Sequence, residues 1–434
     1  MEKVTVIGAG LAGVEAANTL ANAGIKVRLI DMKPKEKSPA HKSDLFAELV
    51  CSNSLKAERI DSAAGLLKEE MRILGSICVD TALGCKVAAG GALAVDRDVF
   101  SKTITEKIRA HENIEIVEER VDKIPDGYVI VATGPLTDGK LAENIAEICS
   151  SEYLNFYDAA APIVTKDSID FEYAFYQSRY GKGGDDYINC PFSKDEYEAF
   201  HAELISAESA KLSEFDTPPT VYEGCMPIEI LAKRGLDAPR FGPMKPVGLV
   251  NPKTEHRPWA VVQLRAENND RTLYNLVGFQ TNLKFPEQKR VFSMIPGLRN
   301  AEFVRYGVMH RNSFIDSPRL LSSDFSLKKC DRIYFCGQLS GVEGYMESAA
   351  SGIIAAKALI SKLKGEKPIE FPKYTMLGAL SGYISDESVK NFQPMGANFG
   401  VLPPLETKIR DKRERYMKLS ERSLNWYQAH FNYK

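Results

Sequence analysis

The sequence contains no apolar run close to the length that a membrane-spanning helix needs, which is about 20 residues. Of its 434 residues, 44% are hydrophobic and 26% are charged, an ordinary balance for a globular protein. The chain starts directly with strand-like residues and lacks the basic segment and cleavage site of a secretory signal. We therefore expect a soluble, cytoplasmic protein that makes no membrane contact.

Paired cysteines and an excess of one charge are also missing. The eight cysteines form no CxxC pair, so we expect neither a zinc site nor a disulfide framework, and no metal is predicted. The 56 Lys and Arg residues are balanced by 58 Asp and Glu residues, which gives a net charge of −2. A nucleic-acid partner would therefore have to bind a local basic patch.

A glycine motif stands at the beginning of the chain. Three glycines form GxGxxG between a strand pattern and a helix pattern, where they permit a tight turn and a close approach of the backbone to a pyrophosphate. The helix N-terminus favours the negative charge of that group. Asp31 closes the next strand, at the distance expected of a carboxylate that accepts from a ribose hydroxyl. The predicted contacts in the turn are Gly8, Ala9, Gly10, Leu11, Ala12 and Gly13.

Two further segments favour FAD over NAD as the dinucleotide. VATGP at 131–135 resembles the ATG signature of two-dinucleotide-fold flavoproteins, and FCGQLSGVEGYMESAASG at 335–352 resembles their C-terminal flavin motif. A helix is expected to begin near Tyr345, with its N-terminus toward the flavin. No second GxGxxG follows a strand, so a nicotinamide reductant would visit the flavin only transiently. The predicted FAD contacts here are Thr133, Gly134, Gly337, Gln338, Gly341, Val342, Gly344 and Tyr345.

The length favours two domains, and the sequence pattern changes along the chain. Helix patterns follow the suitable N-caps Ser62 and Asp96, and strand patterns occur at 128–134 and 332–337. Between them, Tyr, Pro and Gly punctuate short apolar alternations. We predict an α/β fold with a discontinuous, Rossmann-like FAD-binding domain and an α+β insertion domain. The predicted ranges are 1–150 and 300–370 for the FAD domain, 151–299 for the insertion and 371–434 for a C-terminal extension that packs on the FAD domain.

Several longer segments are too specific for a general flavoprotein. Over about residues 1–390 the chain resembles the methylenetetrahydrofolate- and FAD-dependent tRNA uracil-5-methyltransferases. The segments that carry this resemblance are HKSDLFAELVCSNSLK (41–56), GLLKEEMR (65–72), AAGGALAVDR (88–97), ATGPLT (132–137), SRYGKGGDDYINCP (178–191), EGCMPIE (223–229), RFGPMKPVGL (240–249), AVVQLR (260–265), YNLVGFQT (274–281), IPGL (295–298), RYGVMHRNSF (305–314) and the GQLSGVEGY run.

The resemblance implies methylation of carbon-5 of a T-loop uridine in tRNA, with methylenetetrahydrofolate as carbon donor and reduced FAD as carrier and reductant. Such chemistry needs a thiolate that adds to carbon-6 of the uracil. Cys51 and Cys225 lie in family-like segments. We assign Cys225 as the nucleophile, and Cys51 then removes the carbon-5 proton or guards the flavin. The other cysteines discussed, Cys78, Cys149, Cys190, Cys330 and Cys336, are interpreted as small buried hydrophobic residues.

The resemblance also suggests how the other partners bind. His310 is the candidate to stack or hydrogen-bond on the pterin of the folate, with Tyr345 and Gln338 in the same pocket. NADPH or NADH is the expected reductant. The target uridine must be extruded from the folded tRNA, and Arg and Lys side chains of the protein would hold the RNA backbone. The candidate RNA-binding residues are Arg97, Arg179, Lys245, Arg265 and Arg311.

The sequence leaves three alternatives open. The same chemistry on a ribosomal RNA uridine would use the same motifs. A flavin oxidoreductase acting on a small molecule would need neither the two cysteines nor folate. A non-catalytic, flavin-binding RNA-folding protein would keep its function without either cysteine. The oligomeric state has no signal in the sequence.

Overall fold

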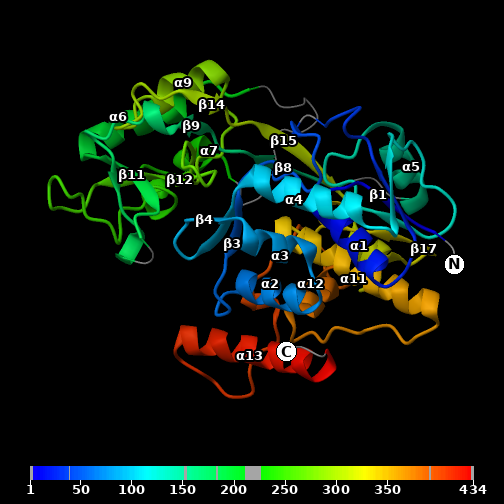
Figure 1. Cartoon of the computed structure of the whole chain (residues 1–434). Coiled ribbons are helices and arrows are strands. Elements are labelled where there is room, and N and C mark those ends of the chain that lie inside the picture. Colours follow the sequence, from blue (N-terminus) through cyan, green and yellow to red (C-terminus); the bar gives the residue numbers. More distant parts are fainter. Residues whose placement is uncertain are drawn as a thin grey trace.

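The fold is built on two six-stranded sheets (Figure 1). The structure is a computed structural model that describes residues 3–38, 40–150, 154–181, 184–210, 226–390 and 392–431. In the first sheet β16 is antiparallel to its neighbour and the other strands run parallel. The strand order is β16 (Ser326–Leu327), β17 (Cys330–Phe335), β7 (Val129–Val131), β1 (Val4–Ile7), β2 (Val27–Asp31) and β6 (Ile114–Glu118).

This first sheet confirms the predicted Rossmann-like architecture. The strands expected near 128–134 and 332–337 are β7 and β17, and they pair with each other although about 200 residues separate them. The helices expected after Ser62 and Asp96 also form, and both caps act as predicted, because each side chain accepts backbone N–H groups of the first turn. The helices of this part are α1 (Leu11–Asn22), α2 (Ala63–Ile73), α3 (Ile77–Gly84), α4 (Arg97–Ala110), α5 (Gly139–Cys149) and α11 (Tyr345–Lys364).

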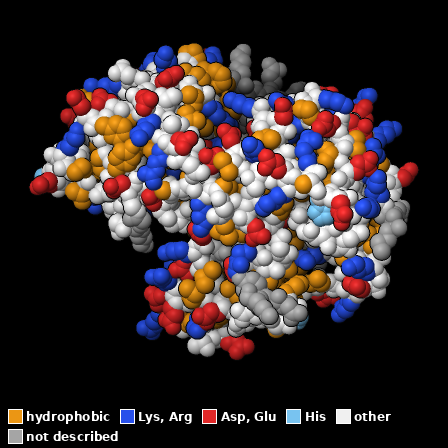
Figure 2. Space-filling model, viewed as in Figure 1, with side chains coloured by type: hydrophobic (Ala, Val, Ile, Leu, Met, Phe, Trp, Pro, Cys, Tyr) orange, Lys and Arg blue, Asp and Glu red, His pale blue; other side chains and the backbone are white. Residues whose placement is uncertain are grey.

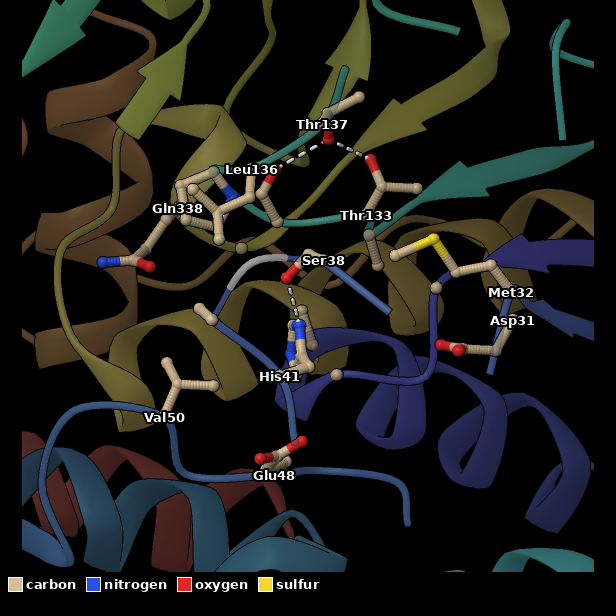
Figure 3. A pocket seen from close by; sticks show the side chains of 18 of the residues that line it. Asp31, Met32, Ser38, His41, Glu48, Val50, Thr133, Leu136, Thr137 and Gln338 are labelled. Carbon is tan, nitrogen blue, oxygen red and sulfur yellow. Dashed lines mark hydrogen bonds between the residues drawn. The ribbon is translucent and has the colours of Figure 1, made fainter. Parts of the chain in front are cut away.

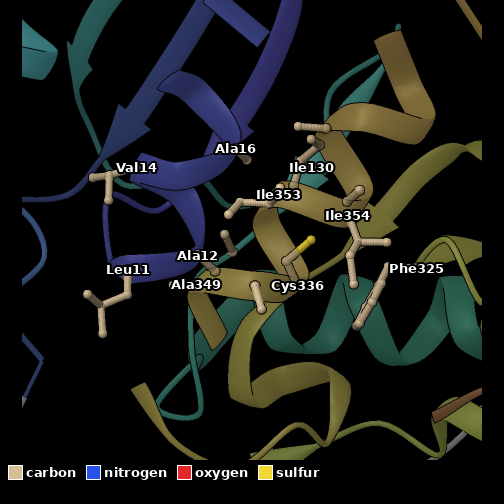
Figure 4. Packing of buried hydrophobic residues seen from close by; sticks show 14 of the residues in the cluster. Leu11, Ala12, Val14, Ala16, Ile130, Phe325, Cys336, Ala349, Ile353 and Ile354 are labelled. Atoms are coloured by element: carbon tan, nitrogen blue, oxygen red, sulfur yellow. The ribbon is translucent and has the colours of Figure 1, made fainter. Parts of the chain in front are cut away.

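Helices α1 and α11 cross closely on one face of the first sheet. A Cβ atom added at Gly352 would lie 2.1 Å from the carbonyl oxygen of Ala12, so only glycine permits this approach. Figure 4 shows Ala12 and Ala349 at the crossing and the larger side chains of Ile353 and Ile130 nearby. The crossing places the N-termini of both helices at the carboxyl ends of β1 and β17, where ligands of open α/β sheets bind.

The second sheet is antiparallel and lies in the upper left of Figure 1. Its order is β10 (Phe175–Tyr176), β11 (Tyr187–Phe192), β12 (Ala260–Ala266), β13 (Leu273–Leu276), β9 (Ile163–Thr165) and β14 (Phe303–Arg305). Strand β14 lies a few residues beyond the predicted end of the insertion at 299, because it pairs with β9. The accompanying helices are α6 (Lys194–Ser206), α7 (Ile228–Ala232), α8 (Ala238–Phe241) and α9 (Phe285–Phe292).

The two faces of this sheet differ in polarity. On β12, Val262 and Leu264 belong to the apolar cluster that also contains α6 and α9 side chains. Gln263 and Arg265 alternate with them and therefore project from the opposite face. Both faces of β12 are buried, so these polar side chains lie inside the protein rather than in solvent.

Two smaller sheets connect the two lobes, which are the parts of the molecule built on the first and on the second six-stranded sheet. Strands β3 (Ser54–Ala57), β5 (Ala92–Val95) and β4 (Lys86–Val87) form one, and β8 (Leu154–Ala159) pairs with β15 (Met309–Phe314) in the other. Asn53 donates from Nδ2 to the carbonyl oxygen of Ala266 at 2.9 Å, which joins the first of these sheets to β12. A short helix, α10 (Ser317–Leu320), follows β15.

The last helices, α12 (Met376–Ile384) and α13 (Lys412–His430), pack against α2 in the lower part of Figure 1. Glu70 of α2 is fully buried there and accepts hydrogen bonds from both helices. Figure 2 shows an indented outline between α13 and the lobe of the second sheet, with acidic and basic side chains interspersed over the visible face. Within the described ranges, no helix combines the length and the apolar character that a membrane crossing requires.

Candidate active site

The glycine turn after β1 has the geometry of a dinucleotide cradle. Gly8 has a φ of +96°, and a Cβ atom there would lie 2.5 Å from the carbonyl oxygen of Ala132. A Cβ atom on Gly13 would lie 1.8 Å from the carbonyl oxygen of Gly8, so this glycine serves the packing of helix against turn. A Cβ atom on Gly10 would meet no atom within 4 Å. Gly10 therefore faces open space beside the N-terminus of α1.

Asp31 lies at the carboxyl end of β2, beside the same turn. Its Oδ2 accepts the backbone N–H of Ala9 at 2.6 Å, and its Oδ1 accepts that of Lys33 at 2.9 Å. These bonds fix the carboxylate between the two loops, and it lines the first cavity (Figure 3). Acceptance of a ribose hydroxyl by Asp31 stays a prediction.

The first cavity encloses about 210 Å³ and runs from the glycine turn to the start of α11. Its lining brings together most residues that were predicted for FAD, from four separate segments. The predicted residues that line it are Gly8, Gly10, Leu11, Ala12, Asp31, Thr133, Gly134, Gly337, Gln338 and Tyr345. Thr133 and Thr137 share a hydrogen bond of 2.7 Å that closes the turn after β7 (Figure 3).

The remaining predicted FAD residues do not line the first cavity. Ala9 is fully buried and uses its N–H on Asp31. Gly341, with a φ of +80°, lies against the ring of Phe392, and Val342 bridges to Met395, so both accommodate the C-terminal segment. Gly344 lines the second cavity, where a Cβ atom would lie 2.3 Å from Oε2 of Glu347.

Sequence reasoning missed part of the first cavity. His41 accepts or donates a 2.6 Å hydrogen bond with Ser38, and burial together with the nearby Lys33 charge lowers its pKa. Glu48 accepts the backbone N–H of Lys42 at 2.9 Å. The family-like segment 41–56 was a signal for His41 and Glu48. The other missed residues include Asn312, which lies in the family-like segment 305–314, and Met32, Lys33, Ser38, Glu119, Arg120 and Val121, which had no such signal.

Cys51 and Tyr345 meet where the two cavities adjoin. The Tyr345 hydroxyl oxygen lies 2.9 Å from Sγ of Cys51 and accepts the backbone N–H groups of Cys51 at 2.8 Å and of Ser52 at 3.2 Å. Burial and the neighbouring Cys51 raise the pKa of Tyr345 well above its ordinary value, so its hydroxyl keeps its proton. Both residues line both cavities. The thiol is therefore held by a neutral hydroxyl at the edge of the predicted flavin site.

Cys225 lies outside the described residues, so its assignment as nucleophile stays a prediction. The described residues on either side of its segment are placed near the second cavity. Ala210 donates its N–H to the carbonyl oxygen of Asn282 at 2.8 Å, and Ile228 donates to that of Gln280 at 2.8 Å. Gln280 lines the second cavity together with Cys51.

The other predicted structural cysteines have the expected surroundings, with one difference. Cys78, Cys149, Cys190 and Cys336 are buried, and burial raises the pKa of each thiol, which disfavours the reactive thiolate. Cys330 is only partly buried at the start of β17.

Two of the three predicted folate residues line the cavities. His310 is on β15, opposite Asp158 of β8, and its side chain is outside the described part of the structure. Gln338 lines both cavities and donates from Nε2 to Oε2 of Glu343 at 2.9 Å. Tyr345 also lines both.

The cations predicted for RNA differ widely in exposure. Arg97 is 15% exposed, with Nε 2.5 Å from Glu267, and also donates to the carbonyl oxygen of Leu49 at 2.7 Å. Arg179 donates to Oε1 of Gln263 at 2.7 Å. Lys245 is exposed, whereas Arg265 is only 6% exposed. The side chain of Arg311, on β15, is outside the described residues.

These contacts change the interpretation of two of the five. Arg97 and Arg265 hold the lobes together through Glu267, Asn53 and Ser52, and neither presents a guanidinium to the surface for a phosphate. Sequence reasoning missed this because their partners lie on distant segments.

The second cavity encloses about 220 Å³ and shares Val50, Cys51, Gln338 and Tyr345 with the first. Its far wall is the polar face of β12 and β13, with Arg265 and Asn275. Its floor carries Glu347, whose Oε1 accepts from Lys56 Nζ at 2.7 Å. A polar pocket therefore adjoins the predicted flavin cavity, with Cys51 between them.

Comparisons with known proteins agree with this geometry. The family model for glucose inhibited division protein A matches residues 3–367. The chain is 57% identical to the methylenetetrahydrofolate–tRNA-(uracil-5-)-methyltransferase TrmFO of Acetivibrio thermocellus over 425 residues, or 98% of this chain and 97% of that protein. A protein of the same name from Enterococcus faecalis is 56% identical over 424 residues, with 98% and 97% covered.

Among solved structures, Aquifex aeolicus GidA has a similar fold. The TM-score is 0.69 at 16% identity, with 98% of this chain and 73% of that chain covered. At that identity the likeness concerns the fold alone, whereas the two relatives match nearly the full length of the chain. The chain therefore belongs to the glucose inhibited division protein A family and, within it, to the methylenetetrahydrofolate–tRNA-(uracil-5-)-methyltransferases.

Proposed function

We propose that this protein methylates carbon-5 of a T-loop uridine in tRNA, with methylenetetrahydrofolate as carbon donor and FAD as carrier and reductant. The observation that carries the proposal is the full-length identity of 57% with a methyltransferase of that name. The thiol of Cys51 at the junction of two cavities is the local geometry that this chemistry requires. We place the reaction in the cytoplasm.

The residues of the first cavity fit FAD. The positive φ of Gly8 and the open space beside Gly10 leave room for a pyrophosphate at the N-terminus of α1. Asp31, the residue assigned to the ribose, is fixed by its hydrogen bonds and lines this cavity, and the lining continues to the start of α11. When bound there, the flavin supplies the ability to carry a one-carbon unit and to donate reducing equivalents.

The protein contributes thiol chemistry and positioning. Uracil carbon-5 becomes nucleophilic when a thiolate adds to carbon-6, and we assign that addition to Cys225. Cys51 then takes the proton from carbon-5 or guards the flavin. Tyr345 fixes the position of Cys51 through its hydroxyl, because it binds the thiol and two successive backbone N–H groups at once.

The other partners are proposed from the same site. His310, Gln338 and Tyr345 are the residues assigned to the folate. NADPH or NADH would reduce the flavin during a transient visit. Lys245 and Arg311 remain the cations assigned to the RNA backbone, together with Arg179.

The alternatives from the sequence are less favoured. Neither a small-molecule oxidoreductase nor a non-catalytic RNA-folding protein accounts for the 56–57% identity to methyltransferases over nearly the whole chain. Methylation of ribosomal RNA uses the same chemistry, and the names of the relatives specify tRNA.

The test is transfer of label from methylene-labelled tetrahydrofolate to an unmodified tRNA transcript, with FAD and a nicotinamide reductant. We expect label in 5-methyluridine of the T-loop, dependent on both FAD and folate. Label in ribosomal RNA alone would show that ribosomal RNA, not tRNA, is the substrate. Label in neither RNA would refute the proposed methyltransferase activity.

A further inference from the structure

The second cavity contains a buried amide that lacks a hydrogen-bond partner. Asn275 on β13 is 3% exposed and lines this cavity. Its Nδ2 has no partner among the described residues. A buried N–H group without an acceptor destabilises the fold, and native proteins rarely leave one unpaired without a reason. The amide is therefore prepared for an acceptor that enters the cavity.

Arg265 stands beside Asn275 on the neighbouring strand. The two residues are cross-strand partners in the register of β12 and β13, so their side chains project side by side from the same face. Arg265 donates from Nε to Asn53 at 3.0 Å and from Nη2 to Ser52 at 2.9 Å. These bonds use two of its five N–H groups and hold the guanidinium in place. This wall of the cavity is consequently rich in fixed donors.

The donors face a cavity that reaches Cys51. The same cavity is lined by Cys51 and Tyr345, and Gly278 and Val277 supply apolar lining next to Asn275. A planar ring in this space would therefore have its edge toward β13 and another edge toward the thiol. This is the arrangement needed by a base that is extruded from RNA and read along its Watson–Crick edge.

We propose that the second cavity binds the uracil ring of the target uridine and that Asn275 hydrogen-bonds its imide edge, with Arg265 favouring the ring carbonyls. Uracil presents two carbonyl acceptors on either side of one N–H donor, and a carboxamide matches a carbonyl and the N–H together. Cytosine carries an amino donor in place of one carbonyl, and it would oppose the donors of Arg265. The wall thus selects uracil over cytosine as well as positioning it. This inference rests on the proposed function.

The chemistry of the wall distinguishes uracil from the pterin of the folate. A pterin presents an amino group, a ring N–H and only one carbonyl along one edge, and carboxylates suit the two donors. Of the carboxylates of this cavity, Glu343 precedes α11 and Glu347 lies in its first turn, so neither comes from β12 or β13. Glu343 accepts a hydrogen bond from Gln338, and Oε1 of Glu347 accepts one from Lys56, whereas the buried Oε2 of Glu347 has no partner among the described residues and is an open acceptor on the α11 side of the cavity. The donor-rich wall therefore fits the ring that has two carbonyls.

The first experiment compares the full-length wild type with Asn275→Asp and Asn275→Ala. Steady-state methylation gives KM and kcat for a T-arm RNA and for methylenetetrahydrofolate. We expect kcat/KM for the RNA to fall by about tenfold or more in both variants, with KM for folate unchanged. Asn268→Ala is the matched control, because Asn268 lies in the same β12–β13 hairpin, is only partly buried and does not line the second cavity.

A second experiment measures binding without turnover. The Kd of a T-arm hairpin that has the target uridine is compared with that of the same hairpin with an abasic target position. The wild type and Asn268→Ala should bind the uridine hairpin more tightly, and Asn275→Asp should lose most of that difference. Asn275→Asp is nearly isosteric, so it provides the answer if Asn275→Ala does not fold.

Two results would overturn the assignment. One is a rise of KM for folate with unchanged RNA kinetics, which would show that this wall binds the pterin instead of uracil. The other is unchanged kinetics and unchanged uridine-against-abasic discrimination in a folded Asn275→Asp protein. Failure of the wild type to methylate any RNA would instead refute the proposed function, so the two failures are distinguishable.

Discussion

The hydroxyl oxygen of Tyr345 lies 2.9 Å from Sγ of Cys51 and accepts the backbone N–H of the same residue at 2.8 Å. Tyr345 is the first residue of α11, whereas Cys51 belongs to a loop almost 300 positions earlier. One phenol thus fixes both the main chain and the thiol of Cys51, and it couples α11 to the loop that carries the cysteine.

Removal of this hydroxyl should slow the chemistry of Cys51 and leave the fold intact. In Tyr345→Phe the thiolate loses a hydrogen-bond donor, so alkylation of Cys51 by iodoacetamide at pH 7 should slow by about fivefold or more. Peptide mass spectrometry measures the rate at Cys51 itself. Tyr383→Phe is the control, because that hydroxyl bonds the carbonyl oxygen of Gln393 away from the cavities. Equal rates in wild type and Tyr345→Phe would contradict the positioning role.

The glycine turn gives a prediction that separates binding from folding. Gly10→Ala introduces a methyl group into open space at a φ of −71°, so the stability of the FAD-free protein should change by less than about 1 kcal/mol. Bound FAD should fall strongly, because the methyl group occupies the space beside the pyrophosphate. Gly13→Ala meets the carbonyl oxygen of Gly8 and should destabilise the FAD-free protein itself. Absorbance of bound flavin measures FAD content, and denaturant unfolding measures stability. Full FAD content in Gly10→Ala would contradict the assignment of this turn to the FAD pyrophosphate.

Arg97 and Lys245 should respond in opposite ways. Arg97→Gln leaves the buried Glu267 without its cation, so the free energy of unfolding should fall by about 3 kcal/mol. Lys245→Gln should leave stability unchanged and weaken RNA binding, with the slope of log K against log salt reduced by roughly 0.7–0.9. Urea unfolding and RNA binding at several salt concentrations measure both effects. A normal stability for Arg97→Gln with weaker RNA binding would restore Arg97 as a phosphate contact.

Glu70 should make stability depend on pH at the junction of α2 with α12 and α13. It accepts the N–H groups of Met376 at 2.7 Å and Leu377 at 2.9 Å, and the hydroxyls of Ser423 and Tyr427. Burial raises its pKa from 4.5 to about 7, although these hydrogen bonds act in the opposite direction.

The sign of the effect follows from that raised pKa. The folded state binds the proton more tightly, so this contribution to stability is complete below pH 4.5 and is lost as the pH rises through 7. Glu70→Gln has no such titration. The stability advantage of wild type over Glu70→Gln should therefore shrink by up to about 3 kcal/mol between pH 4.5 and pH 8. Urea unfolding of both proteins across this range tests it, and a constant difference would contradict the raised pKa.

The parts of this protein that follow a local rule were predictable from its sequence. The turn at Gly8 and Gly10, the caps Ser62 and Asp96, and the start of α11 at Tyr345 each depend on neighbouring residues, and the structure confirms them. The second cavity does not follow from any local rule. Asn275 and Arg265 look like ordinary strand residues, and their meaning comes from the pairing of β12 with β13 and from the lobe that faces them.

Arg97 shows the same limit from the other direction. Its positive charge in a family-like segment suggested a contact with RNA. In the structure, however, Arg97 forms a largely buried ion pair with Glu267, which lies far along the chain. Contacts between residues so distant in sequence depend on how the two lobes pack, which the composition and spacing of either segment do not determine.

The most direct test of the central claim is label transfer from methylene-labelled tetrahydrofolate to a tRNA transcript by wild type, Cys51→Ala and Cys225→Ala, at equal bound FAD. We predict labelled 5-methyluridine with the wild type and its loss in both cysteine variants, which keep their flavin and their fold. Full labelling by both variants would contradict the thiol chemistry, and an unlabelled tRNA with the wild type would contradict the methyltransferase itself.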